Sequence, residues 1–373
     1  MFSAVGEAFV ENFDSRGEVG AAVCVAVDGE VVVDLWGGWA DVAHMRPWEG
    51  DTLVNVFSVG KGLCALVAAR LASLGELDVA APVSRYWPEF SAGGKRDMSV
   101  AQLLSHQGGL PSVRDRLPPG AMLNHELMAG ALAAQAPWWV PGTRHGYHAN
   151  TFGFLVGELV RRLRGRTLGR FLAEEVTIPL GADVHIGLAP EHHGRVAEFA
   201  FPAVPPPEVE PDLAAADLME FNAYWNPSGL SGAGVVNTAT WRQAEIPSTN
   251  GHGTARGVAR IYSALAAGGS LDGVEIVDRD VLAAFTSEAV YGDDAVLHRP
   301  SRFGLGCQLT QPERPLGSGS RAFGHFGAGG SLGYADPERG LAFGYVIGTM
   351  GPRWQNPRNR ALIGAVTSSV AAT

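Results

Sequence analysis

The 373-residue sequence has little cysteine and no run of basic residues. Its three cysteines, Cys24, Cys64 and Cys307, are far apart, and no C-x-x-C pair occurs. Neither a disulfide framework nor a thiolate metal site is indicated, and a reducing compartment fits best. The 28 Lys and Arg against 38 Asp and Glu give a net charge of −10. We therefore expect no nucleic-acid partner.

Long apolar runs are also absent. The N-terminal stretch MFSAVGEAFVENFDSRGEVG lacks the basic segment and following apolar segment of a secretory leader. No uninterrupted apolar run reaches the ~18 residues that a membrane-spanning helix needs. We therefore expect a cytoplasmic protein without a membrane span. Its 46% hydrophobic content allows a sizeable core, arranged as about two domains or one large composite domain.

Strand and helix patterns occur at both ends of the chain. Residues 3–14 predict an amphipathic helix, and two β-branched runs joined at Asp28-Gly29 predict a hairpin. An almost wholly apolar stretch from Ser58 to Leu74 predicts a buried helix that stops before Gly75. Strands return in RAFGHFGAGGSLGYAD and GLAFGYVIGTM, and a helix closes the chain.

Between these ends, Pro and Gly break the sequence into short helical patterns. We therefore predict an α/β domain made of residues 1–81 and 231–373, with a mostly helical domain of residues 82–230 inserted in it. The active site is expected in the cleft between the two domains.

Lys61 is an unexpected charge in the buried helix. Residues i and i+3 share a helix face, so Ser58 and Lys61 would present a hydroxyl and an amine side by side. The positive end of the helix dipole and an apolar setting both favour the neutral amine, which a general base near pH 7 requires. A short S-x-x-K pattern also fits a lysine that reaches the surface from a helix end.

Two further sequence elements support a catalytic role for Ser58 and Lys61. Tyr147, in GYHANTFGFLVGEL, precedes an amphipathic helix and is placed to pass a proton, although a half-buried tyrosine with Asn150 as N-cap is the simpler interpretation. His325 and Gly327, in GHFGAGG, open a glycine-rich strand that another backbone or a ligand can approach closely.

The order of these elements resembles the serine β-lactamase-like superfamily, which includes class C β-lactamases, D-alanyl-D-alanine carboxypeptidases and family VIII carboxylesterases. FSVGK, LLSHQGGLP, YHANTFGFLVGEL, NGHGTARGVARIY and GHFGAGGSLGYADPERGLAFGYVIG carry the likeness over most of the chain. The resemblance implies a β-lactamase/transpeptidase-like fold, with an antiparallel sheet flanked by helices and a mostly helical insert.

The same resemblance implies a set of roles. Ser58 would be the acylated nucleophile, Lys61 its general base and Tyr147 the proton shuttle. His325 would stand where many relatives have the lysine of K-T-G, with Gly327 two residues on. The backbone N–H groups of Ser58 and Ala328 would form the oxyanion hole. No metal or organic cofactor is implied.

Two departures from the lactamase pattern favour the esterase branch. Ala149 replaces the Asn of Tyr-x-Asn, whose amide contacts a substrate amide. His325 replaces a fixed cation and is expected to be only partly charged near pH 7. Both changes weaken recognition of amides that bear a carboxylate, and a neutral ester tolerates both. The sequence therefore most resembles the family VIII carboxylesterases.

Other patterns are weaker candidates. GGSLG around Ser331 matches a nucleophile elbow, but strand, turn and strand follow it, and no His follows His325. Histidine groups without metal-ligand spacing are expected to be structural or solvated, and His252 to be scaffold. These groups are His125-Glu126, His145 with His148, and His192-His193. Trp138, Trp139, Trp225 and Trp241 are expected to pack beside the cleft, some as an acyl pocket.

The leading hypothesis is a serine carboxylesterase that acts on a small-molecule ester through a Ser58 acyl-enzyme. An acyltransferase would use the same residues and transfer the acyl group to an alcohol or amine. A β-lactamase or D-Ala-D-Ala peptidase would need the missing Asn and Lys. A degenerate binding module would be expected to have lost Ser58, Lys61 or Tyr147, and all three are present.

Overall fold

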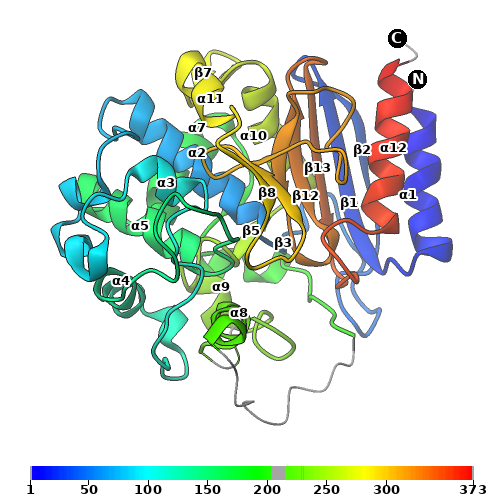
Figure 1. Ribbon diagram of the computed structural model, residues 1–373. Coiled ribbons are helices and arrows are strands. Elements are labelled where there is room, and N and C mark those ends of the chain that lie inside the picture. Colours follow the sequence, from blue (N-terminus) through cyan, green and yellow to red (C-terminus); the bar gives the residue numbers. More distant parts are fainter. Residues whose placement is uncertain (1, 203–214, 228, 230, 372–373) are drawn as a thin grey trace.

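An eight-stranded antiparallel sheet forms the centre of the molecule (Figure 1). The computed structural model describes residues 2–202, 215–227, 229 and 231–371. The strand order is β2-β1-β13-β12-β11-β10-β9-β8. Their bounds are β1 Gly20–Val27, β2 Glu30–Gly38, β8 Val290–Asp293, β9 Pro300–Phe303, β10 Gln308–Leu309, β11 Phe323–Phe326, β12 Leu332–Asp336 and β13 Leu341–Ile347. Because β1 pairs with β13, the two ends of the chain share one sheet, as predicted.

The turn between β1 and β2 follows the sequence signal. Asp28 and Gly29 have φ angles of +51° and +84°. Two successive left-handed residues are what a tight type I′ hairpin requires, and Asp-Gly meets that requirement. The pairing of Val27 with Glu30 across this turn confirms the predicted hairpin.

Helices cover both faces of the sheet (Figure 1). Helices α1 (Ser3–Ser15) and α12 (Pro357–Ala371) lie side by side on one face, and α10 (Ala255–Ala266) packs against the other. A Cβ at Gly344 of β13 would lie 2.3 Å from the Ala255 carbonyl oxygen. Glycine at this strand position therefore lets α10 pack close to the sheet.

A buried helix, α2 (Val59–Ser73), runs beside this sheet and carries the S-x-x-K pattern. It follows β3 (Val54–Phe57), which belongs to a small sheet in the order β3-β5-β4. The other two strands are β4 (Val184–His185) and β5 (Gly251–Gly253). The predicted buried helix is confirmed.

Seven further α-helices lie between α2 and β5 in the described part of the chain, joined by long irregular segments. These helices are α3 Val100–Leu104, α4 His125–Ala134, α5 Thr151–Arg164, α6 Leu168–Leu172, α7 Ile178–Leu180, α8 Ala215–Trp225 and α9 Ala239–Gln243, with α11 Arg279–Phe285 later in the chain. Among the described residues, no helix is both long enough and apolar enough to cross a bilayer. Strands β8 to β10 were not predicted, and the domain boundaries at 82 and 230 stay a prediction.

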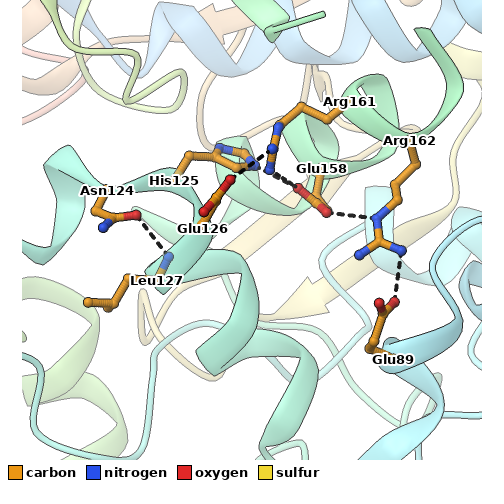
Figure 2. A network of polar contacts seen from close by, with 8 residues as sticks. All are labelled: Glu89, Asn124, His125, Glu126, Leu127, Glu158, Arg161 and Arg162. Carbon is orange, nitrogen blue, oxygen red and sulfur yellow. Dashed lines mark hydrogen bonds and ion pairs between the residues drawn. The ribbon is translucent and has the colours of Figure 1, made fainter. Parts of the chain in front are cut away.

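An ion-pair network joins α4 and α5 (Figure 2). Glu158 lies 3.0 Å from His125 and also binds Arg161 and Arg162, at 3.1 and 2.8 Å. Arg162 in turn binds Glu89. Burial raises the pKa of Glu158, but hydrogen bonds from His125 and Arg162 outweigh it and lower that pKa to about 2. His125 is thus part of a cluster that joins two helices, which is the structural role expected as one of two possibilities.

Candidate active site

Ser58 stands where strand β3 turns into helix α2. The preceding residue, Phe57, has a φ of +49°, in the left-handed region that an aromatic residue rarely adopts. Its ring packs edge-on against Phe199, with centroids 4.8 Å apart. Strained backbone of this kind is held in place by surrounding packing and clusters at functional sites. Here it turns the chain sharply, immediately before the predicted nucleophile.

The Lys61 amine lies beside the Ser58 hydroxyl. Their Nζ and Oγ atoms are 3.0 Å apart, and Nζ donates a second hydrogen bond, also 3.0 Å, to the Ser248 carbonyl oxygen. The chain has only one other lysine, Lys95, whose amine donates to the backbone carbonyls of Ala92, Ala133 and Gln135. Lys95 therefore joins the C-terminal end of α4 to the segment around Ala92, whereas Lys61 is directed at a hydroxyl.

Close packing around Lys61 removes it from water. A Cβ at Gly60 would lie 2.3 Å from the Pro247 carbonyl oxygen, and one at Gly62 would lie 2.4 Å from the Tyr262 hydroxyl. The two glycines thus let neighbouring segments close over Lys61, which is fully buried. Burial lowers the pKa of the Lys61 amine to about 7. A large share of the amine is therefore neutral near pH 7 and able to accept a proton.

Tyr147 brings its phenol ring against the same amine. Lys61 Nζ is 4.8 Å from the centroid of the Tyr147 ring, and the side chain is 1% exposed. Burial raises the pKa of Tyr147 well above its usual value, and the neighbouring Ser58 side chain opposes this effect, while the phenol oxygen has no hydrogen-bond partner among the described residues. The phenol is therefore protonated in the resting protein, so it is equipped to donate a proton.

Asp294, in the segment after β8, fixes the backbone at Tyr147. Its Oδ1 atom accepts the Tyr147 N–H at 3.0 Å and also the N–H groups of Val296 and Leu297. Its Oδ2 atom accepts the Ser301 hydroxyl at 2.8 Å, and His145 lies 2.8 Å from that hydroxyl. Asp294 is 2% exposed. No local pattern marks this residue, because its role depends on a contact between residues 147 positions apart in the chain.

We expect Asp294→Asn to lower kcat for ester hydrolysis by about tenfold and to change KM less. The amide keeps one acceptor oxygen, so it cannot accept from both the Tyr147 N–H and the Ser301 hydroxyl. Tyr147 then loses its fixed position while the substrate pocket persists. A small misplacement of a catalytic group lowers the rate by this factor or more. Steady-state kinetics measure the split. The exposed neighbour gives the control, Asp293→Asn. Equal kcat values for the two variants would show that Asp294 does not position Tyr147 for catalysis.

Asn150 does not cap helix α5, contrary to the prediction. It occupies the N-cap position, but its side chain makes no capping hydrogen bond. The amide instead donates to the Ala223 carbonyl oxygen at 2.8 Å and accepts from Thr249 at 3.0 Å. Asn150 therefore holds α8 beside the site, and it does not supply the substrate-facing amide that is missing at Ala149.

His325 faces the site from strand β11 as a neutral ring. Its Nδ1 atom lies 2.7 Å from the Phe326 carbonyl oxygen and must donate to it, so Nε2 carries the lone pair. Nε2 is buried without a partner among the described residues. Burial, assisted by Lys61, lowers the pKa of His325 to about 3. The expected partial charge near pH 7 is therefore wrong, and His325 offers an acceptor in place of a cation.

The loop after His325 lies against the strand that leads to Ser58. A Cβ at Gly327 would come within 2.3 Å of the Val56 carbonyl oxygen, so only glycine fits there. Ala328 opens a single 3-10 turn, Ala328–Gly330, and Ser58 precedes the first turn of α2. Amide N–H groups at the start of a helical turn lack a partner within that turn, so both can serve an oxyanion.

The setting of Ser331 differs from that of Ser58, and His145 belongs to the hydrogen-bond network around Asp294. Ser331 leads into strand β12 and not into a helix, as predicted against a nucleophile elbow. His145, His148 and His252 are buried. Histidines 192 and 193 lie in a partly exposed 3-10 segment. In the part of the chain that the structure describes, no three His, Cys, Asp or Glu side chains are grouped to hold a metal ion.

The tryptophans divide between the core and the surface. Trp139 packs in a cluster with Tyr147 and Phe303, and Trp138 packs against that cluster. Trp241 is buried and donates to Asn55, while Trp225 is 47% exposed. Trp354, which no sequence pattern marked, has its ring centroid 4.8 Å from that of Tyr147. Its position comes from the loop before α12, for which the sequence offered no motif.

Comparison with known proteins shows which family the chain belongs to. A model of the Beta-lactamase family matches residues 7–368. The chain belongs to the Beta-lactamase family. Within it, the chain is 37% identical over 361 residues to the Esterase/beta-lactamase LipL of Mycobacterium tuberculosis, covering 92% of this chain and 80% of that one. It is also 33% identical over 190 residues to Esterase EstB of Burkholderia gladioli, covering 46% and 48%.

Solved Beta-lactamase-family structures show the same fold. A family VIII carboxylesterase superposes with a TM-score of 0.91 at 40% identity, covering 99% of this chain and 97% of the other. A penicillin-binding protein homolog from Caulobacter crescentus gives the same values. The predicted β-lactamase/transpeptidase-like fold and the predicted superfamily are therefore confirmed.

Proposed function

We propose that the protein is a serine carboxylesterase. The observation that carries the proposal is the 3.0 Å contact between Ser58 Oγ and the amine of Lys61, whose pKa is lowered to about 7. A nucleophile within hydrogen-bond reach of a neutral base is the arrangement that acyl transfer requires. Relatives named as esterases support ester hydrolysis.

In the proposed reaction, Ser58 Oγ attacks the ester carbonyl carbon while Lys61 takes the hydroxyl proton. The carbonyl oxygen becomes an oxyanion held by the N–H groups of Ser58 and Ala328. The carbon–oxygen bond to the alcohol then breaks, and Tyr147 donates its proton to the leaving alcohol and recovers one from Lys61. Water, deprotonated by Lys61, then attacks the acyl carbon. The bond from this carbon to Ser58 Oγ breaks, the acid leaves, and Lys61 returns the proton to Ser58.

The arrangement of the site supports the proposed domain division. Ser58, Lys61 and His325 come from the segments 1–81 and 231–373, and Tyr147 comes from 82–230. Their side chains meet, with the rings of Tyr147 and His325 6.0 Å apart. We propose on this basis that the site lies between an α/β and a mostly helical domain.

Ester turnover should exceed lactam and peptide turnover. The chain lacks the Asn of the second motif, and its third motif holds a neutral His325. A panel of p-nitrophenyl esters, nitrocefin and a D-Ala-D-Ala peptide compares the activities directly. We expect the highest kcat/KM for an ester, and loss of that activity in Ser58→Ala. Equal or faster turnover of nitrocefin or the peptide would contradict the proposal.

Activity should rise with pH through about 7 and then level off. The neutral form of Lys61 is the base, and burial has lowered its pKa to about 7, so protonation below that value removes the base. His325, with a pKa near 3, stays neutral throughout. The measurement is kcat/KM for a non-ionising ester between pH 5 and 9. A flat profile over this range would contradict Lys61 as the base.

A further inference from the structure

Arg299 lies at the edge of the active site, one aromatic ring away from Tyr147. It stands in the loop between β8 and β9, and its guanidinium carbon is 5.0 Å from the centroid of the Trp354 ring. The Trp354 ring is in turn 4.8 Å from Tyr147 and 6.3 Å from His325. Arg299 also acts electrostatically on both Tyr147 and Tyr224. A cation therefore borders an aromatic wall of the site.

This guanidinium has no anionic partner among the residues that the structure describes. Among the described residues, its side chain makes no hydrogen bond and no ion pair, whereas its neighbours His298 and Arg302 pair with Glu220 and Glu288 at 2.8 Å. Asp294 attracts Arg299 from beyond ion-pair distance. The Asp294 oxygens already accept four hydrogen bonds.

The surroundings of Arg299 further disfavour its positive charge. The side chain is half-buried, and burial lowers its pKa, with repulsion from Arg353 acting in the same direction. Partial burial of an unpaired charge is unfavourable, so a bound anion would be stabilised here. The guanidinium that lies over the Trp354 ring also presents a planar fork that matches a carboxylate.

We propose that Arg299 binds a carboxylate carried on the alcohol portion of the ester substrate. The inference rests on the proposed esterase function, in which Tyr147 donates its proton to the leaving alcohol. Groups around Tyr147 therefore face that alcohol. A cation for this carboxylate is thus supplied outside the third motif, where His325 is neutral. Among esters, the expected preference for a neutral substrate is reversed, whereas amides still lack the Asn of the second motif.

Matched aryl esters test the proposal. The two substrates are 4-carboxyphenyl butyrate and 4-carbamoylphenyl butyrate, which have the same acyl group and nearly the same shape. In the wild-type protein we expect the higher kcat/KM for the carboxylate, by about tenfold, and a fall in this ratio as NaCl is raised. Arg299→Gln should remove most of the preference. The ratio is taken within one protein, so loss of folded protein cancels.

The control removes an arginine at the far end of strands β12 and β13, Arg339→Gln, and should leave the ratio unchanged. An unchanged ratio in Arg299→Gln, or a wild-type ratio insensitive to salt, would overturn the carboxylate site while carbamoyl ester turnover still supported the esterase. Failure to cleave either ester would instead overturn the esterase and the inference with it.

A second pair of esters tests whether Arg299 acts on the alcohol portion or on the acyl portion of the substrate. Mono-4-nitrophenyl glutarate and 4-nitrophenyl valerate carry the carboxylate difference on the acyl portion. We expect Arg299→Gln to change their ratio much less than that of the butyrates. An effect confined to the glutarate pair would contradict the placement of the carboxylate on the alcohol.

Discussion

Lys61→Met should lower kcat/KM for ester hydrolysis by about a thousandfold or more, without lowering the melting temperature at pH 7 to 8. Methionine has a similar length but no base, so Ser58 keeps its proton. The amine has a pKa of about 7 when folded and its ordinary, higher value when unfolded. Between these values the unfolded chain binds more protons, so burying Lys61 costs stability, which methionine recovers.

Lys95→Met is the matched control. Both lysines are fully buried, but the Lys95 amine holds three backbone carbonyl oxygens and does not contact the site. Its loss leaves those carbonyls unpaired, which lowers stability. Kinetics and thermal melting should therefore give opposite patterns for the two variants. Substantial activity in Lys61→Met would exclude it as the base.

Tyr147→Phe should lower kcat by about a hundredfold or more while the protein stays folded. The substitution removes only the hydroxyl, and the ring keeps its packing against Trp354 and Lys61. Without the phenol proton, the alcohol must leave as an alkoxide. The loss should therefore be larger for alkyl esters, whose alcohols are poor leaving groups, than for p-nitrophenyl esters.

A second buried phenol provides the comparison for Tyr147. Tyr334 is buried on β12, and its hydroxyl has no partner among the described residues. Tyr334→Phe should leave kcat unchanged for both classes of ester. An equal loss for alkyl and p-nitrophenyl esters in Tyr147→Phe would show that the tyrosine is needed for shape and not for its proton.

Local patterns in the sequence were enough for several parts of the fold and site. The Asp28-Gly29 turn, the buried helix α2 and the spacing of Ser58 and Lys61 are all set by residues that are neighbours in the chain. The i to i+3 spacing alone places the amine beside the hydroxyl, without any tertiary contact. The ordered motifs then indicated the family.

Contacts between segments far apart in the chain could not be predicted from the sequence. The Ser248 carbonyl that accepts from Lys61 carries no residue-type signal, because every residue has one. Asp294 and Arg299 lie between two short strands, β8 and β9, that the sequence did not predict. The neutral state of His325 depends on burial, which a local pattern does not report. These features appear only once the chain has folded.

Labelling with a fluorophosphonate probe, followed by peptide mass spectrometry, tests the central claim most directly. The probe reacts covalently with an activated serine hydroxyl. We expect one labelled peptide, with the phosphonyl group on Ser58, and no labelling in Lys61→Met at pH 7. Labelling at Ser331, or no labelling of the wild-type protein, would contradict the account.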